Sequence, residues 1–187
     1  QMLGQDTIVL FGNGACGNIG PVDMMNPKRN EYGHRWRKRI GLALGCEAIK
    51  IIALTDHLPL EEIEIRKDIL DIPIREIPQD RLDEAKKAFM GRSLEPAPTD
   101  YNDIVRRELI LLAEQRAEDP FAHAEIMAIR IGKSSIIGIP AELFCDLGIR
   151  IKEGSKYKPT FVVELANGCV GYVPTAESFN GGGYETE

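Results

Sequence analysis

Three glycines in the stretch TIVLFGNGACGNIGP have the spacing of a loop that binds the pyrophosphate of a dinucleotide. Gly12, Gly14 and Gly17 form the pattern G-x-G-x-x-G. The apolar run before them, Thr7 to Phe11, predicts a short buried strand. Such a loop binds phosphate through the first amides of a helix that opens at the last glycines. Pro21 follows too soon for a long helix to begin there, so the loop needs another explanation.

The histidines and cysteines form no recognisable catalytic or metal-binding pattern. His34, His57 and His123 are far apart and fit no zinc spacing, so each is predicted to be structural or solvated. No G-x-S-x-G nucleophile elbow is present. The cysteines are scattered without a C-x-x-C pair, so neither a zinc knuckle nor a dense disulfide framework is indicated: Cys16, Cys46, Cys145 and Cys169.

Two other residues could do chemistry, although each also has an ordinary structural interpretation. Glu142 follows the predicted strand SIIGIPA and is expected to open a helix, where an acidic residue complements the helix dipole. Tyr172, two residues before Pro174, is by default a core tyrosine whose hydroxyl finds a hydrogen-bond partner. The residues alone do not decide between structure and chemistry at these positions.

The composition is that of a soluble domain. With 187 residues and 43% hydrophobic content, the chain is long enough for one domain, 1–187, with a real core. A net charge of -6 argues against a general nucleic-acid binder, and the basic cluster His34–Arg39 is expected to be a solvated helix face. No apolar run is long enough to cross a bilayer, and the chain shows no targeting signal, so its compartment stays open.

Hydrophobic periodicity predicts alternating helices and strands. Helices are expected over 31–54, 80–89, 101–117 and 142–152. Strands are expected over 124–131 and 135–139, joined at Gly132-Lys133-Ser134, and over 63–77 as a half-buried strand bent near Pro73. A hairpin over 160–173, closed by Asn167-Gly168, would place Tyr172 opposite Val163. This order indicates an α/β layered domain with mixed, partly antiparallel sheets flanked by helices.

The sequence resembles the neutral and alkaline, non-lysosomal ceramidases and their bacterial relatives. Four segments carry the resemblance in the family's order and span almost the whole chain: FGNGACGNIGP, EIEIRKDILDIPIREIP, AEIMAIRIGKSSIIGIPAELFCDLGIRIK and TFVVELANGCVGYVPTAESFNGGGYE. The last two are the most specific. The chain therefore looks like the C-terminal portion of a ceramidase-like catalytic domain.

The resemblance implies half of a zinc site. A glutamate zinc ligand after a strand ending in Pro-Gly corresponds to Glu142 in Pro140-Ala141-Glu142, with alanine for glycine. The tyrosine of the segment GYV is a further ligand and corresponds to Tyr172, and a tyrosine twelve residues later, which assists the reaction, corresponds to Tyr184. Two histidine ligands in the family lie before the glycine loop, in a part that would precede Gln1, and no histidine of this chain aligns with them.

The glycine loop is implied to contact substrate rather than phosphate. Asn18 and the amides around Gly17 are expected to line the substrate channel, with the glycines allowing the backbone to approach a reacting acyl group. Gly20 stands where the family's ceramidases carry a serine implicated in catalysis or substrate contact. That departure predicts weak or no hydrolysis of ceramide, even by a full-length protein.

Two functions remain open at this stage. The first is a zinc-dependent hydrolase that cleaves an amide or related acyl bond of a small molecule by metal-activated water, present as a partial catalytic domain. The second is a non-catalytic binding or assembly domain that needs a partner segment to complete the site. With two ligands in the expected places, tight zinc binding by this chain alone is not expected. Oligomerisation, or association with the missing N-terminal portion, is expected from the surface left exposed.

Overall fold

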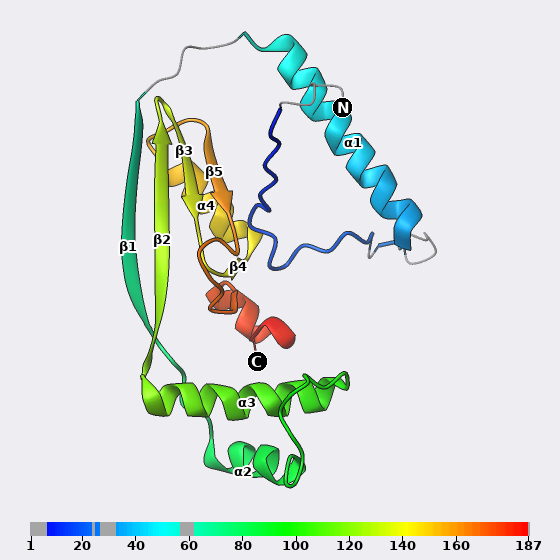
Figure 1. Ribbon diagram of the computed structural model, residues 1–187, viewed down its shortest axis with the longest axis vertical. Helices are drawn as coiled ribbons and strands as arrows, with labels where there is room; N and C mark the ends of the chain where they lie inside the picture. The colour runs from blue at the N-terminus through cyan, green and yellow to red at the C-terminus, as the bar shows by residue number, and fades with distance from the viewer. Residues whose placement is uncertain (1–6, 24, 27–32, 57–61, 187) are drawn as a thin grey trace. The chain divides into compact units, whose positions relative to one another are not determined.

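The computed structural model describes residues 7–23, 25–26, 33–56 and 62–186. In this part of the chain, helices and strands alternate in a mixed α/β arrangement (Figure 1), which confirms the predicted fold class. The chain divides into two compact units, residues 1–67 with 127–187, and residues 68–126. Strands β1 (Ile63–Pro73) and β2 (Phe121–Ile131) each run from one unit into the other.

The main sheet has four strands in the order β1-β2-β3-β5. β2 and β3 (Ser134–Gly138) pair antiparallel with Ile131 opposite Ser134, which confirms the predicted hairpin at Gly132. β5 (Thr160–Val163) then pairs parallel with β3, with Ser135 opposite Thr160. A second, small sheet joins β4 (Glu142–Leu143) and β6 (Tyr172–Val173) in parallel. The helix α4 (Cys145–Gly154) follows β4, and two short 3-10 helices, η1 (Ala176–Asn180) and η2 (Tyr184–Thr186), end the described chain.

The second unit is built around a helical pair. α2 (Gln79–Ala88) and α3 (Tyr101–Glu118) lie side by side (Figure 1), and their apolar faces bury Ala85, Phe89, Leu109 and Ile110. α3 begins where the carboxylate of Asp100 accepts a hydrogen bond from the Asp103 amide at 3.2 Å, as expected of an N-cap. Both helices confirm the sequence prediction to within two residues at each end.

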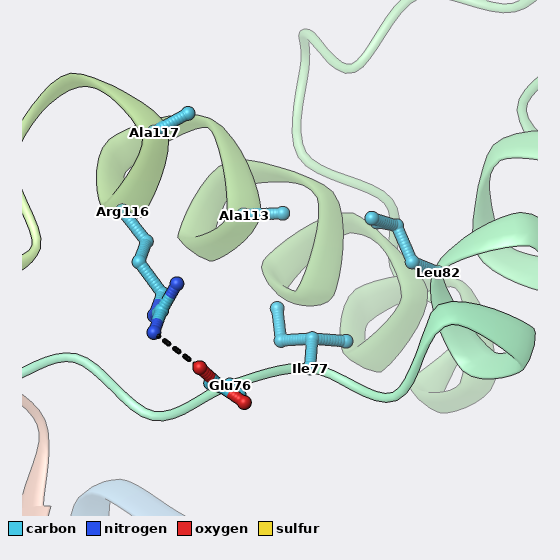
Figure 2. Close-up of a pocket in the computed structure, with 6 residues that line it drawn as sticks. All are labelled: Glu76, Ile77, Leu82, Ala113, Arg116 and Ala117. Carbon is cyan, nitrogen blue, oxygen red and sulfur yellow. Dashed lines mark hydrogen bonds and ion pairs between the residues drawn. The ribbon is translucent and has the colours of Figure 1, made fainter.

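A pocket in the second unit is lined by an ion pair and by apolar side chains. Arg116 donates to Glu76 at 2.8 Å and to the Ile74 carbonyl oxygen at 3.0 Å, while Ile77 and Leu82 lie against α3 (Figure 2). Because the Arg116 guanidinium is engaged by its own neighbours, the pocket offers a ligand little unpaired charge. None of the predicted site residues lines it.

Several predicted elements take a different form. Thr7 to Phe11 forms no strand, and its apolar side chains from Ile8 onward are 74% to 90% exposed. The helix α1 (Gly33–Leu54) is present where periodicity predicted one, yet none of its residues is buried. β1 ends at Pro73 and is exposed rather than half-buried along nearly its whole length. The prediction of burial was wrong for Thr7 to Phe11 and for β1, because a pattern of apolar side chains shows which face could be buried but not whether another element covers it.

The predicted hairpin over 160–173 is also wrong. The amides of Leu165, Ala166 and Val170 donate to carbonyl oxygens of residues 139–141 instead of pairing across the turn. Asn167 and Gly168 do adopt the positive φ values, 68° and 144°, that a tight turn requires. These two residues thus have positive φ values, but they close no hairpin, since the flanking strands β5 and β6 belong to two different sheets.

Candidate functional site

Glu142 and Tyr172 lie at paired positions of neighbouring parallel strands. Glu142 belongs to β4 and not to a helix opening, since α4 begins at Cys145, so that part of the sequence prediction was wrong. Backbone bonds hold the two strands together: the Glu142 amide donates to Gly171 at 2.9 Å and the Phe144 amide donates to Val173 at 3.1 Å. This register makes Glu142 the Cα partner of Tyr172. Strand geometry therefore brings together two side chains that are 30 residues apart in sequence.

The side chains of the pair meet. The Tyr172 side chain lies near Glu142 and against the Tyr184 ring, and the interaction with Glu142, followed by burial, raises the pKa of the Tyr172 phenol far above its usual value. The two oxygen-bearing side chains that the resemblance implies as metal ligands thus lie close to each other.

Tyr184 completes this group from the C-terminal end. Its ring stands edge-on to that of Tyr172, with 5.4 Å between centroids and an interplanar angle of 85°. It lies in η2 and is 57% exposed, so Tyr184 is partly accessible to solvent beside Tyr172. The structure brings all three residues together; their roles stay predictions.

The glycine loop packs directly against the strand that carries Glu142. The Gly17 amide donates to the Leu143 carbonyl oxygen at 2.9 Å. A Cβ atom at Gly17 would lie 2.5 Å from the Glu142 carbonyl oxygen, which no real Cβ could tolerate, so glycine is required there by close approach. The loop whose glycine spacing resembles that of a dinucleotide-binding loop therefore supports the strand that carries Glu142.

Asn18 and Gly20, the other loop residues expected to contact substrate, differ in their surroundings. The Asn18 side-chain oxygen accepts a hydrogen bond from the Cys145 amide at 2.8 Å and so caps α4, whose own N-cap residue provides no side-chain bond. Gly20 is exposed, and a Cβ atom there would meet nothing within 4 Å. Contact of these residues with substrate stays a prediction.

The buried carboxylate of Glu164, which the sequence analysis did not identify, is hydrogen-bonded to the glycine loop at Cys16. Glu164, only 5% exposed, accepts hydrogen bonds from the Cys16 amide at 3.0 Å and from the Cys16 thiol at 2.7 Å. The signal was present in the sequence, since a lone glutamate at the end of the apolar run TFVV is expected to be buried only with partners.

The bond to Glu164, burial, and the negative charges of Glu164 and Glu142 raise the pKa of the Cys16 thiol to about 11. Thiolate is the reactive form, and its fraction below the pKa falls about tenfold for each unit by which the pKa rises. We therefore expect iodoacetamide at pH 8.5 to alkylate Cys16 at least about tenfold more slowly than the exposed Cys46 and Cys169. Peptide mapping by mass spectrometry against time measures all three rates in one sample, and equal rates would contradict the hydrogen-bonded, protonated thiol.

The histidines take no part in this group. His123, in β2, lies between Asp71 at 2.7 Å and Asp119 at 3.0 Å, and these hydrogen bonds raise the pKa of His123. His34 is exposed in the first turn of α1, and His57 lies outside the described residues. Across residues 7–23, 25–26, 33–56 and 62–186, no three His, Cys, Asp or Glu side chains gather in a way that would hold a metal ion.

Comparison with solved structures relates the fold to ceramidases. A crystal structure of the neutral ceramidase from Pseudomonas aeruginosa matches with a TM-score of 0.61 and 19% identity, over 99% of this chain and 35% of that one. A structure of a ceramidase complexed with C2 matches with a TM-score of 0.48 and 18% identity, over 79% of this chain and 30% of the other. The first match shows a shared fold, and the chain spans about a third of the length of that ceramidase.

Comparison at the level of sequence adds no family assignment. No protein-family model matches the chain, and no curated protein shows significant similarity to it. Within the described residues, none of the helices is both long enough and apolar enough to cross a bilayer.

Proposed function

We propose that this chain carries part of the active site of a zinc-dependent hydrolase that cleaves an amide or related acyl bond. The observation that carries the proposal is the placement of Glu142 and Tyr172 at matched positions of the neighbouring strands β4 and β6. Similarity of the fold to a neutral ceramidase supports the reaction class. The natural substrate need not be ceramide.

Glu142 and Tyr172 would be two of the zinc ligands. A carboxylate is a normal zinc ligand, and a phenol adds a second oxygen donor once its proton has left. Zinc sites normally use three or four protein ligands, so the remaining ones have to come from residues beyond this pair. When bound, zinc would lower the pKa of a water molecule toward neutrality and polarise the carbonyl group to be cleaved.

Tyr184 would act on the substrate. Its position beside Tyr172, with more than half of its surface exposed, lets its hydroxyl reach a molecule that approaches the pair from solvent. A phenol donates a hydrogen bond to the carbonyl oxygen as negative charge develops there. Loss of one such donor typically costs about 3 kcal/mol of activation free energy.

The direct test uses the protein at the length its gene encodes, purified without chelators. We expect close to one equivalent of zinc by mass spectrometry, and zinc-dependent release of fatty acid from an N-acyl amide or acyl ester of a fluorogenic leaving group. Removal of zinc by a chelator should abolish that release, and readdition should restore it. Protein that is folded, holds no zinc and cleaves neither substrate would refute the proposal.

Gly20 gives a prediction about substrate choice. Because the resemblance places a serine there and the structure leaves a side chain free of clashes, we expect Gly20→Ser to raise ceramide hydrolysis at least about tenfold above a weak starting activity. Gly20→Ala, which adds a methyl group without the hydroxyl, is the matched control and should not do so. Ceramide turnover followed by fatty-acid release measures both variants, and equal rates in all three proteins would contradict a role for the hydroxyl.

A non-catalytic assembly domain is the second candidate. It is favoured by α1, a helix of 22 residues with none buried, and by the exposed apolar run Ile8 to Phe11. Such apolar surface is typical of a segment that another polypeptide covers. A folded protein that is zinc-free and inactive, but elutes as a stable complex in light scattering, would favour this function over hydrolysis.

A further inference from the structure

Glu164 forms hydrogen bonds with the glycine loop at two positions, Asn13 and Cys16. The Glu164 amide donates to the Asn13 carbonyl oxygen at 3.0 Å, while the Glu164 carboxylate accepts from the amide and the thiol of Cys16. Between these attachments the chain turns through Gly14 and Ala15. Glu164 therefore fixes the shape of the loop just before Gly17 contacts β4.

The burial of Glu164 requires an explanation. A carboxylate withdrawn from water loses much of its hydration, and that cost is offset only when hydrogen-bond donors replace the lost water. Here the two carboxylate oxygens each receive one donor from Cys16. The cysteine matters as a donor, because its raised pKa keeps the proton on sulfur.

The glycine loop, supported by Glu164, packs against the strand that carries Glu142. β4 has only two residues, so its own ladder with β6 gives it little rigidity. On its other side the Gly17 amide bonds Leu143 at 2.9 Å, and the Gly17 backbone approaches Glu142 as closely as a residue without a Cβ atom can. A loop that moved away from β4 would lose the bond to Leu143 and release Glu142 from this support.

We propose that Glu164 is a positioning residue of the Glu142–Tyr172 site, acting through Cys16 to press the glycine loop against the strand that carries Glu142. The inference rests on the proposed function for the chemistry of the site, but the Glu164–Cys16 connection can be tested without it. Residues that orient metal ligands typically change metal affinity or activity by about 10–100-fold when they are replaced.

The experiment compares Glu164→Gln, Cys16→Ala, Cys16→Ser and the double variant Glu164→Gln/Cys16→Ala in the protein at its natural length. We expect the first two to weaken zinc affinity and lower kcat about tenfold or more, with KM changed much less. Cys16→Ser should stay within about threefold of wild type, because a hydroxyl also donates to the carboxylate. The double variant should be no worse than either single one, since both remove the same connection. Glu153→Gln, on the exposed end of α4, is the matched control.

Alkylation of Cys16 reports on the connection even in a protein without activity. Glu164→Gln should speed the reaction of Cys16 with iodoacetamide about tenfold or more at pH 8.5, while Cys46 reacts at its wild-type rate. An unchanged Cys16 rate would overturn the inference. So would folded Glu164→Gln protein that keeps zinc affinity and kcat within about twofold, even if its unfolding midpoint falls. If Glu164→Gln fails to fold, the inference is tested by comparing the zinc affinity and kcat of Cys16→Ala with those of Cys16→Ser. Equal values in the two variants would overturn it. A wild-type protein that neither binds zinc nor cleaves substrate would refute the proposed function, while the alkylation result would still stand.

Discussion

Glu142→Gln and Tyr172→Phe are each expected to lower acyl hydrolysis by at least about a hundredfold and to reduce the zinc content of the protein. Replacing groups that merely orient a metal ligand already costs about 10–100-fold, so removing a ligand atom should cost more. Both substitutions keep the size of the side chain. They remove, respectively, the carboxylate charge of Glu142 and the phenol hydroxyl of Tyr172. Zinc by mass spectrometry and kcat/KM on the fluorogenic N-acyl amide measure the effect.

Matched variants elsewhere in the chain separate this effect from damage to the fold. Glu153→Gln changes an exposed glutamate of α4, and Tyr157→Phe changes a half-buried tyrosine outside the site. Both should keep the wild-type zinc content and rate. Loss of one hydrogen bond at Tyr172 typically costs about 1 kcal/mol of folding free energy, which a stable domain tolerates. Wild-type activity in Glu142→Gln would remove the basis for the hydrolase assignment.

Gly17→Ala is expected to destabilise the protein by about 1–3 kcal/mol, the usual cost of forcing a methyl group into packed surroundings. The new Cβ would lie 2.5 Å from the Glu142 carbonyl oxygen and 3.0 Å from the Leu143 carbonyl carbon, so backbone rather than a pliable side chain has to move. Because that backbone carries Glu142, activity should fall together with stability. Urea unfolding should show a lower midpoint with an unchanged m-value.

Gly20→Ala, three residues later in the same loop, is the control for Gly17→Ala. Its Cβ would meet nothing within 4 Å, so its free energy of unfolding should stay within about 0.5 kcal/mol of wild type. Equal destabilisation by both substitutions would show that the loop as a whole resists alanine, and would contradict the specific close approach at Gly17.

Local patterns predicted the elements whose partners are close in sequence. The β2–β3 hairpin and the helices α2 and α3 follow from periodicity and turn chemistry, and the structure has them where they were expected. The pairing of β5 with β3 and of β6 with β4 was missed. Asn167 and Gly168 do have positive φ values, but that conformation does not specify which strands their flanks join. The amides of Leu165, Ala166 and Val170 donate to carbonyl oxygens of residues 139–141, a long-range arrangement that no local window contains.

The candidate site was predicted from resemblance and not from pattern. By local rules Glu142 was a helix-opening acid and Tyr172 a core phenol, and nothing in their spacing indicates that they meet. Glu164 was overlooked because a single charged residue only interrupts the pattern of an apolar strand. The pattern does not show which hydrogen-bond donors would stabilise the buried carboxylate. Its donors, the amide and thiol of Cys16, lie 148 residues away in sequence.

The candidate site depends on the exact register of the short ladder between β4 and β6. Side chains on a strand point alternately to opposite faces, and adjacent strands lie about 4.8 Å apart. A slip of one residue would therefore send the carboxylate and the phenol to opposite faces instead of separating them slightly.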